Sequence, residues 1–184
     1  GRPLPMSRRN DLLHLDAFPT RPTHGGRILR AFTNIHPSDD RIWATSEPFE
    51  TLAEQFALPA GLSGVTSPIA SARRSAAEVA RKVGVKVPAR SAYDEFMLHF
   101  HNYLKSNATF QQTGKKQSWA FAPGVTWISF TDQIAHAVLS GRYALEQTCI
   151  VPFSAMVQPD RAPLRVLERL AGRRLARTDG SRSA

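Results

Sequence analysis

The segment from residue 115 to residue 156 constrains the fold more than any other part of the chain. In "KKQSWAFAPGVTWISFTDQIAHAVLSGRYALEQTCIVPFSAM", short β-prone runs alternate with turn residues at Pro123-Gly124 and Ser140-Gly141. β-branched and aromatic runs bounded by Pro and Gly are typical of strands joined by tight turns. The segment therefore predicts at least three consecutive strands and a mainly β core.

Helices are expected to flank this core. A further strand is predicted at "RILRAFTNI", residues 27–35, behind a Gly-Gly turn, and a short helix in "FETLAEQFAL", residues 49–58. Residues 91–107 predict an amphipathic helix, because their apolar residues recur at spacings of three and four. These residues are Tyr93, Phe96, Met97, Phe100, Tyr103 and Leu104. Residues 59–75, rich in Pro, Gly, Ser and Ala, predict a loop or an insertion at the rim.

The composition suits one globular domain. The chain has 184 residues, of which 42% are hydrophobic and 21% charged, and no apolar run reaches the roughly 18 residues of a membrane span. We expect a core over residues 1–155 with a helical insertion near residues 50–106, followed by a basic tail over residues 156–184. The single cysteine, Cys149, excludes a disulfide framework and a multi-cysteine zinc site, and favours the cytoplasm.

The net charge of +9 predicts affinity for an anion, namely a nucleic acid, a membrane surface or a charged small substrate. The chain begins with Gly-Arg-Pro and reaches a candidate site within its first 14 residues. We therefore expect an N-terminally truncated core, with any targeting signal outside the chain.

The tail carries arginines at a four-residue spacing, which places them in a drifting stripe on a helix. They are Arg161, Arg165, Arg169, Arg173 and Arg177, and Leu164, Leu167 and Leu170 accompany them. One interpretation is a solvated helix that docks through its leucines. The other is an interfacial anchor whose arginines meet anionic lipid head groups.

The pair His14 and Asp16 is a candidate metal site. Residues i and i+2 of a strand point to the same face, so an imidazole and a carboxylate can bind one metal. Chance alone gives roughly 0.3 such pairs in a chain of this composition, so the pair needs a third ligand. A histidine from another strand would complete a 2-His-1-carboxylate triad, which leaves positions open on Fe(II). His136 is the best candidate, since it lies between a predicted strand and a turn.

The other histidines have simpler interpretations. His99 and His101 flank the apolar face of the predicted helix and are expected to be surface or hydrogen-bonded edge residues. His24 and His36 lie beside Gly-Gly and Pro, which indicates turns, although His24 is near enough to the pair to touch a substrate.

The segment around His136 resembles the distal half of the double-stranded β-helix, a jelly-roll or cupin-like fold, of iron/2-oxoglutarate dioxygenases. In that superfamily a basic residue follows the second histidine within a hairpin and pairs with the far carboxylate of 2-oxoglutarate. The planar fork of arginine suits a carboxylate, so Arg142 is the first choice for this role. Arg30 is the second, because some branches place the basic residue on the strand after the aspartate.

Two long blocks extend the resemblance to the Kdo hydroxylase family, whose members act on 3-deoxy-D-manno-oct-2-ulosonic acid (Kdo). They are "MSRRNDLLHLDAFPTRPTHGGRILRAFTNIHP" and "SWAFAPGVTWISFTDQIAHAVLSGRYALEQTCIVP". The resemblance implies that the Kdo sugar of lipid A is hydroxylated at C3 while 2-oxoglutarate and O2 yield succinate and CO2. It also implies that His14, Asp16 and His136 hold the Fe(II). Family members have a long segment, including barrel strands, before the first block.

A Kdo-lipid is a carboxylated sugar on a phosphorylated, membrane-embedded anchor, so cations should surround its site. The candidates near His14 are Arg8, Arg9, Arg21, His24 and Arg27. This substrate also predicts a cytoplasmic protein, peripheral on the inner face of the bacterial inner membrane. Nucleic acid is not expected, because the tail from Arg161 onward has no aromatic residue to stack on bases.

Two alternatives stay open. The same residues suit an iron/2-oxoglutarate hydroxylase of another anionic substrate, such as a nucleic acid or a protein. A non-catalytic, cupin-like binding domain would use the same strands without the metal. A co-substrate clamp such as Arg142 has no purpose in a domain that does not bind 2-oxoglutarate, so a role for Arg142 would distinguish a hydroxylase from a binding domain.

Overall fold

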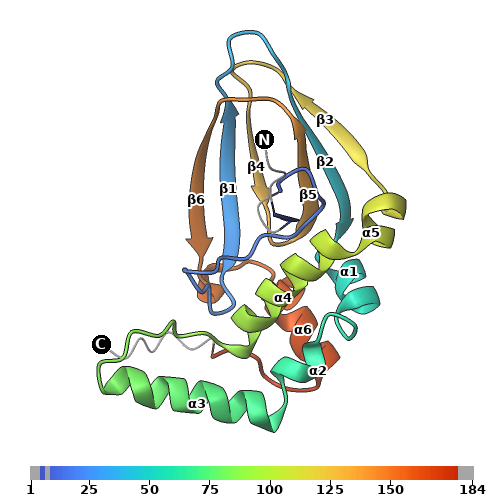
Figure 1. The fold of residues 1–184 in the computed structure, drawn as a ribbon. Helices are drawn as coiled ribbons and strands as arrows, with labels where there is room; N and C mark the ends of the chain where they lie inside the picture. Colours follow the sequence, from blue (N-terminus) through green and yellow to red (C-terminus); the bar gives the residue numbers. More distant parts are fainter. Residues whose placement is uncertain (1–4, 7–8, 178–184) are drawn as a thin grey trace.

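Two three-stranded antiparallel sheets face each other above a layer of helices in the computed structural model, which describes residues 5–6 and 9–177 (Figure 1). One sheet has the order β4-β1-β6 and the other β3-β2-β5. Their bounds are β1 (Arg27–Asn34), β2 (Arg41–Pro48), β3 (Gln117–Phe121), β4 (Thr126–Phe130), β5 (Ile134–Ser140) and β6 (Ala144–Val151). The predicted strands at 27–35 and 115–156 are confirmed, the latter segment forming four.

Aromatic side chains fill the space between the sheets. Alternate residues of a strand share a face, so Ile28, Phe32 and Asn34 of β1 are all buried. Phe32 packs edge-on against Trp43 of the opposite sheet, with ring centroids 4.7 Å apart. Phe121 stacks on Trp127 across the same gap at 3.9 Å. These contacts join the two sheets into one sandwich.

The two predicted turns lie where the sequence indicates. Gly124, between β3 and β4, has φ of 81°, and Gly141, between β5 and β6, has φ of 104°. Glycine adopts this left-handed region without steric cost. A Cβ at Gly141 would also come within 2.8 Å of the Arg41 backbone, so the turn requires glycine for space as well.

Five helices separate β2 from β3, and a sixth follows β6. They are α1 (Phe49–Phe56), α2 (Leu62–Val65), α3 (Pro68–Lys82), α4 (Ala92–Ser106), α5 (Ala108–Thr113) and α6 (Pro163–Ala171), with short 3-10 turns at Phe153–Ala155 and Pro159–Arg161. The predicted helices at 49–58 and 91–107 are confirmed as α1 and α4.

Residues 59–75 were expected to form a loop or an insertion at the rim, and the loop is wrong, because this region contains α2 and the first half of α3. Ser67 caps α3 by accepting a hydrogen bond from the Ala70 backbone N–H, and Pro68 occupies the first helical position. Both features start helices. The alanines that follow have the highest helix propensity, so the composition that suggested a loop supports a helix here.

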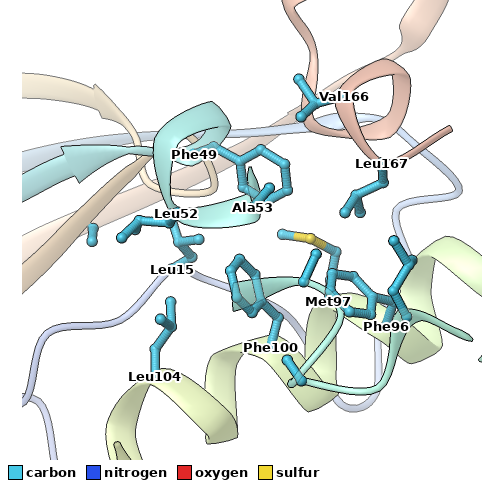
Figure 2. Packing of buried hydrophobic residues seen from close by; sticks show 14 of the residues in the cluster. Leu15, Phe49, Leu52, Ala53, Phe96, Met97, Phe100, Leu104, Val166 and Leu167 are labelled. Atoms are coloured by element: carbon cyan, nitrogen blue, oxygen red, sulfur yellow. The ribbon is translucent and has the colours of Figure 1, made fainter. Parts of the chain in front are cut away.

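The main hydrophobic core lies below the sheets, between α1, α4 and α6 (Figure 2). Phe49 of α1 packs edge-on against Phe100 of α4, and Leu52 of α1 and Leu167 of α6 belong to the same cluster. Leu15 also belongs to this cluster. Its side chain anchors the segment that carries His14 and Asp16 to the helical core, while those two neighbours lie beside the sheets.

The tail helix is shorter than its arginine pattern suggests. It ends at Gly172, whose φ of 63° is left-handed, a common way for a helix to stop. Arg165 pairs with Glu168, Arg169 with Glu50, and Arg173 donates to the Thr66 carbonyl. These arginines therefore contact acceptors of the chain itself.

The leucines of α6 dock it onto the core, as the first interpretation expects. Leu164 and Leu167 are fully buried, whereas Leu170 is 41% exposed. Leu164 also lies against Gly25, where an added Cβ would approach Leu164 Cδ2 to 2.5 Å. The Gly-Gly turn that precedes β1 is thus the surface on which α6 rests.

Replacing Leu167 by alanine should lower the free energy of unfolding by about 2–5 kcal/mol, because it leaves a cavity in a closed core. Leu170→Ala, which removes the same atoms from a half-exposed position on the same helix, should cost much less. Urea unfolding of the two variants measures the difference. Equal effects would contradict docking through the leucines.

Candidate metal centre

The backbone brings His14 and His136 side by side. His14 N–H donates to the His136 carbonyl at 3.0 Å, and His136 N–H donates to the His14 carbonyl at 2.9 Å. Two residues that exchange both bonds in an antiparallel pair point their side chains to the same face. Asp16 N–H donates to the Thr131 carbonyl at 2.8 Å, which fixes the third residue against the chain between β4 and β5.

The three side chains converge on one point, as predicted. His14 Nε2 lies 3.5 Å from Asp16 Oδ1, and His136 Nε2 lies 3.9 Å from the same oxygen. One ligand atom from each residue lies within 4.8 Å of the others, and all three residues are buried. Metal bonds of about 2.0–2.2 Å hold neighbouring ligands roughly 3 Å apart, so a bound ion requires these atoms to approach one another by up to about 2 Å.

The histidines are held with their Nε2 atoms available as ligands. His14 Nδ1 contacts the Leu12 carbonyl at 2.7 Å, and His136 Nδ1 contacts the Ile134 carbonyl at 3.1 Å. A carbonyl only accepts hydrogen bonds, so each Nδ1 carries the proton and each Nε2 keeps its lone pair. Metal-binding histidines have this arrangement of a carbonyl behind the ring. The donor set therefore fits a divalent transition metal.

Asp16 carries a negative charge at the centre of the triad. Burial favours a higher pKa for its carboxyl, but the interactions with His14, His136 and Arg30 outweigh burial and hold the pKa well below the usual range. Arg30 forms an ion pair with Asp16 Oδ2, while Oδ1 faces the two imidazoles. One carboxylate oxygen is thus engaged by the arginine, and the other is directed at the site of a metal.

His136 and His101 are neutral at physiological pH. Burial lowers the pKa of each imidazole to about 4. His136 stacks on Trp43, with ring centroids 5.2 Å apart, and His101 lies edge-on to His14 at 5.0 Å. A neutral imidazole is the form that binds a metal.

The two candidate co-substrate arginines lie in different places. Arg30 points between the sheets, where it contacts Asp16 and also pairs with Glu146 of β6. Arg142 lies in the exposed turn between β5 and β6. Ser140 lies four residue steps beyond His136 along β5, which is roughly 13 Å. The geometry therefore places Arg30, not Arg142, beside the triad.

Among the described residues, three of the cations predicted to surround a substrate contact acidic groups of the chain itself. Arg9 pairs with Asp11, and Arg27 donates to Asp132 at 2.9 Å while its guanidinium covers the Phe130 ring. Arg21 and His24 are exposed, and His24 Nδ1 lies 3.4 Å from the Asp94 carboxylate. Arg8 lies outside the described residues.

Sequence reasoning missed two polar residues next to the triad. His101 was expected at a surface or an edge; its Nδ1 contacts the Leu15 carbonyl at 2.7 Å, but its ring also packs on His14. Lys105, one turn further along α4, is only 2% exposed. The spacing i, i+4 on one helix face was the available signal. It could not show which face meets a segment 86 residues away.

The neutral histidines predict how the stability of the metal-free protein depends on pH. An unfolded histidine titrates near about pH 6.5, so between this value and the folded pKa of about 4 the unfolded chain binds protons that the folded chain does not. The free energy of unfolding should therefore fall as the pH falls through this window. His101→Gln should reduce the slope by up to about 1.4 kcal/mol per pH unit.

Urea unfolding of chelator-treated protein at several pH values measures this slope. His99→Gln changes an exposed histidine on the same helix and should leave the slope as in the unaltered chain. A slope unchanged by His101→Gln would contradict a buried, neutral His101.

Comparison with known proteins agrees with this geometry. The family described as 3-deoxy-D-manno-oct-2-ulosonic acid (Kdo) hydroxylase matches residues 1–174. Among solved structures, the Kdo hydroxylase KdoO, a non-heme Fe(II) alphaketoglutarate-dependent dioxygenase in complex with alphaketoglutarate and Fe(III), is 35% identical with a TM-score of 0.81. The match covers 98% of this chain and 58% of that chain.

A second KdoO structure, with succinate and Fe(III), is 34% identical with a TM-score of 0.80 and covers 96% of this chain and 58% of that one. The KdoO structure with cobalt(II) is 35% identical with a TM-score of 0.81, and the match covers 98% of this chain and 58% of that chain. No curated relative matches the chain. The chain thus spans less than two thirds of the length of KdoO. The similarity to these structures confirms the expected jelly-roll fold. The chain belongs to the Kdo hydroxylase family.

Proposed function

We propose that this chain carries the catalytic centre of an Fe(II)/2-oxoglutarate-dependent dioxygenase that hydroxylates C3 of the Kdo sugar of a lipid A precursor. The observation that supports it most is the buried triad of His14, Asp16 and His136 in a member of the Kdo hydroxylase family. These three residues would hold Fe(II). When bound, the iron activates O2 at the cost of 2-oxoglutarate, which becomes succinate and CO2.

The residues of the chain prepare the site for this chemistry. The carbonyls of Leu12 and Ile134 hold the Nδ1 atoms of the two histidines, which turns each Nε2 toward the site of the metal. Arg30 holds the far oxygen of Asp16, which keeps Oδ1 directed at the imidazoles. Trp43 covers one face of His136 and excludes water from that side.

We further propose Arg30, in preference to Arg142, as the arginine that pairs with the far carboxylate of 2-oxoglutarate. Arg30 is partly buried between the sheets and already contacts two carboxylates, Asp16 and Glu146. Glu146 is 43% exposed in its side chain, so a bound dicarboxylate can replace it as the partner of the guanidinium. Arg142, on the exposed turn, remains the alternative.

Arg30→Met should weaken the binding of 2-oxoglutarate about a hundredfold or more, because loss of one partner from a buried charge pair costs about 3–5 kcal/mol. Arg142→Met should change it little. Titration of 2-oxoglutarate into Co(II)-loaded protein, with the Co(II) content of each variant measured separately, compares the two. A larger effect at Arg142 would show that the clamp lies on the turn.

The reaction itself is tested by succinate release. With Fe(II), O2 and 2-oxoglutarate, the protein should release succinate faster with Kdo-lipid than without it, and mass spectrometry should find one added oxygen on the Kdo. Asp16→Asn keeps the shape of the side chain but removes its charge, and should abolish both signals. If a nucleic acid or a protein stimulates succinate release and Kdo-lipid does not, the protein is a hydroxylase of another substrate. If no substrate gives turnover, the chain is a binding domain.

We also propose that the protein acts in the cytoplasm and meets its lipid substrate at an anionic membrane surface. Among the residues that the structure describes, no helix is long and apolar enough to cross a bilayer, and the chain carries a net charge of +9. Attraction between basic residues and anionic lipids is screened by salt.

The protein should therefore sediment with anionic vesicles at low salt and be released at high salt, while neutral vesicles should not retain it. Arg169→Gln and Arg173→Gln test the contribution of the tail, since neither side chain lies in the core. Binding that is equal at both salt concentrations would rule out the electrostatic contact.

A further inference from the structure

A pocket of about 280 Å³ lies on the α4 side of the triad. One wall is the chain from Asn10 to Pro19, which includes His14 and Asp16, and the opposite wall is one stripe of α4. The α4 residues are Leu98, His101, Asn102 and Lys105. A larger cavity of about 500 Å³ near Arg27 and Phe130 has no member of the triad in its lining, so of these two pockets the smaller can present a ligand to the metal site.

Lys105 places a positive charge in this pocket. Its side chain is almost completely buried, at 2% exposed. Burial lowers its pKa, but the negative charges of Asp16 and Asp11 oppose the shift. Buried lysines are rare, because desolvation of an ammonium is costly unless anions compensate it. The lining of the pocket thus combines this ammonium with the carboxylate of Asp16, and a ligand that enters the pocket can bring an anionic group to Lys105.

The neighbouring groups suit a polyhydroxylated ligand. His101 Nδ1 contacts the Leu15 carbonyl, so this nitrogen carries the proton and Nε2 is left as an acceptor. Asn102 adds an amide, which both donates and accepts. A cation, an imidazole acceptor and an amide along one helix face match a carboxylate that is followed by hydroxyl groups.

We propose that this pocket recognises the substrate sugar acid, with the carboxylate of Kdo bound by Lys105 and its hydroxyl groups by His101 and Asn102. The proposal rests on the proposed function and adds specificity residues to it. The carboxylates of 2-oxoglutarate have the same chemistry, but Arg30 meets them between the sheets and does not line the pocket. The two ligands would thus approach the triad from different sides.

Binding of Kdo and of its methyl ester tests the role of the charge. Both ligands are titrated by calorimetry into protein that holds Co(II) and 2-oxoglutarate, in which no turnover occurs. The unaltered protein should bind Kdo at least about tenfold more tightly than the uncharged ester, because a hydrogen bond to a charged group contributes about this much to affinity. Lys105→Met should abolish this preference, and Lys105→Arg should retain much of it.

Two further variants complete the test. Lys86→Met removes an exposed lysine and should leave the preference intact. Should Lys105→Met fail to fold, Asn102→Asp places a negative charge on the same wall at an exposed position, and should weaken binding of Kdo far more than binding of the ester.

If folded Lys105→Met or Asn102→Asp protein still prefers Kdo to its methyl ester, the proposal is overturned while the proposed function stands. The same holds if these variants bind 2-oxoglutarate more weakly but bind Kdo as the unaltered protein does. If the unaltered protein binds neither Kdo nor the ester, the proposal fails together with the proposed function.

Discussion

The pair of backbone hydrogen bonds between His14 and His136 is the constraint on which the site depends. It joins a segment near the start of the chain to β5, about 120 residues later. Because the two residues face the same way, their imidazoles meet, and the i+2 position brings Asp16 to the same point. The fold supports this pairing from both sides: Leu13 and Leu15 point into the helical core, while His14 and Asp16 face the space beside the sheets.

The second requirement is a balance of charge in a buried place. A carboxylate with little access to water is costly unless cations or hydrogen bonds compensate it. Here Arg30 takes one oxygen of Asp16 and the two imidazoles face the other. An incoming metal ion would add to the same compensation. The arginine thus stabilises the ligand set, and the proposed function gives it a second purpose as the cation that meets a dicarboxylate.

The sequence predicts the local parts of this structure well and the long-range parts poorly. Alternating strands, their glycine turns and the apolar spacing of α4 depend on neighbouring residues, and all were confirmed. The helix α3 was missed because alanine and serine occur in loops as well as in helices, although Ser67-Pro68 was a start signal. The contact of Arg30 with Asp16 and of His101 with His14 depends on how sheets and helices stack, which spacing along the chain does not determine.

Metal binding by the three residues tests the central claim most directly. Co(II), the ion in one KdoO structure, can be titrated into chelator-treated protein and followed by its absorption spectrum. The account predicts one Co(II) per chain in the unaltered protein and in His24→Gln, which changes an exposed histidine. It predicts affinity at least about tenfold lower in Asp16→Ala and in His136→Ala, since even partners behind the ligands contribute 10–100-fold. Equal affinity in all four proteins would contradict it.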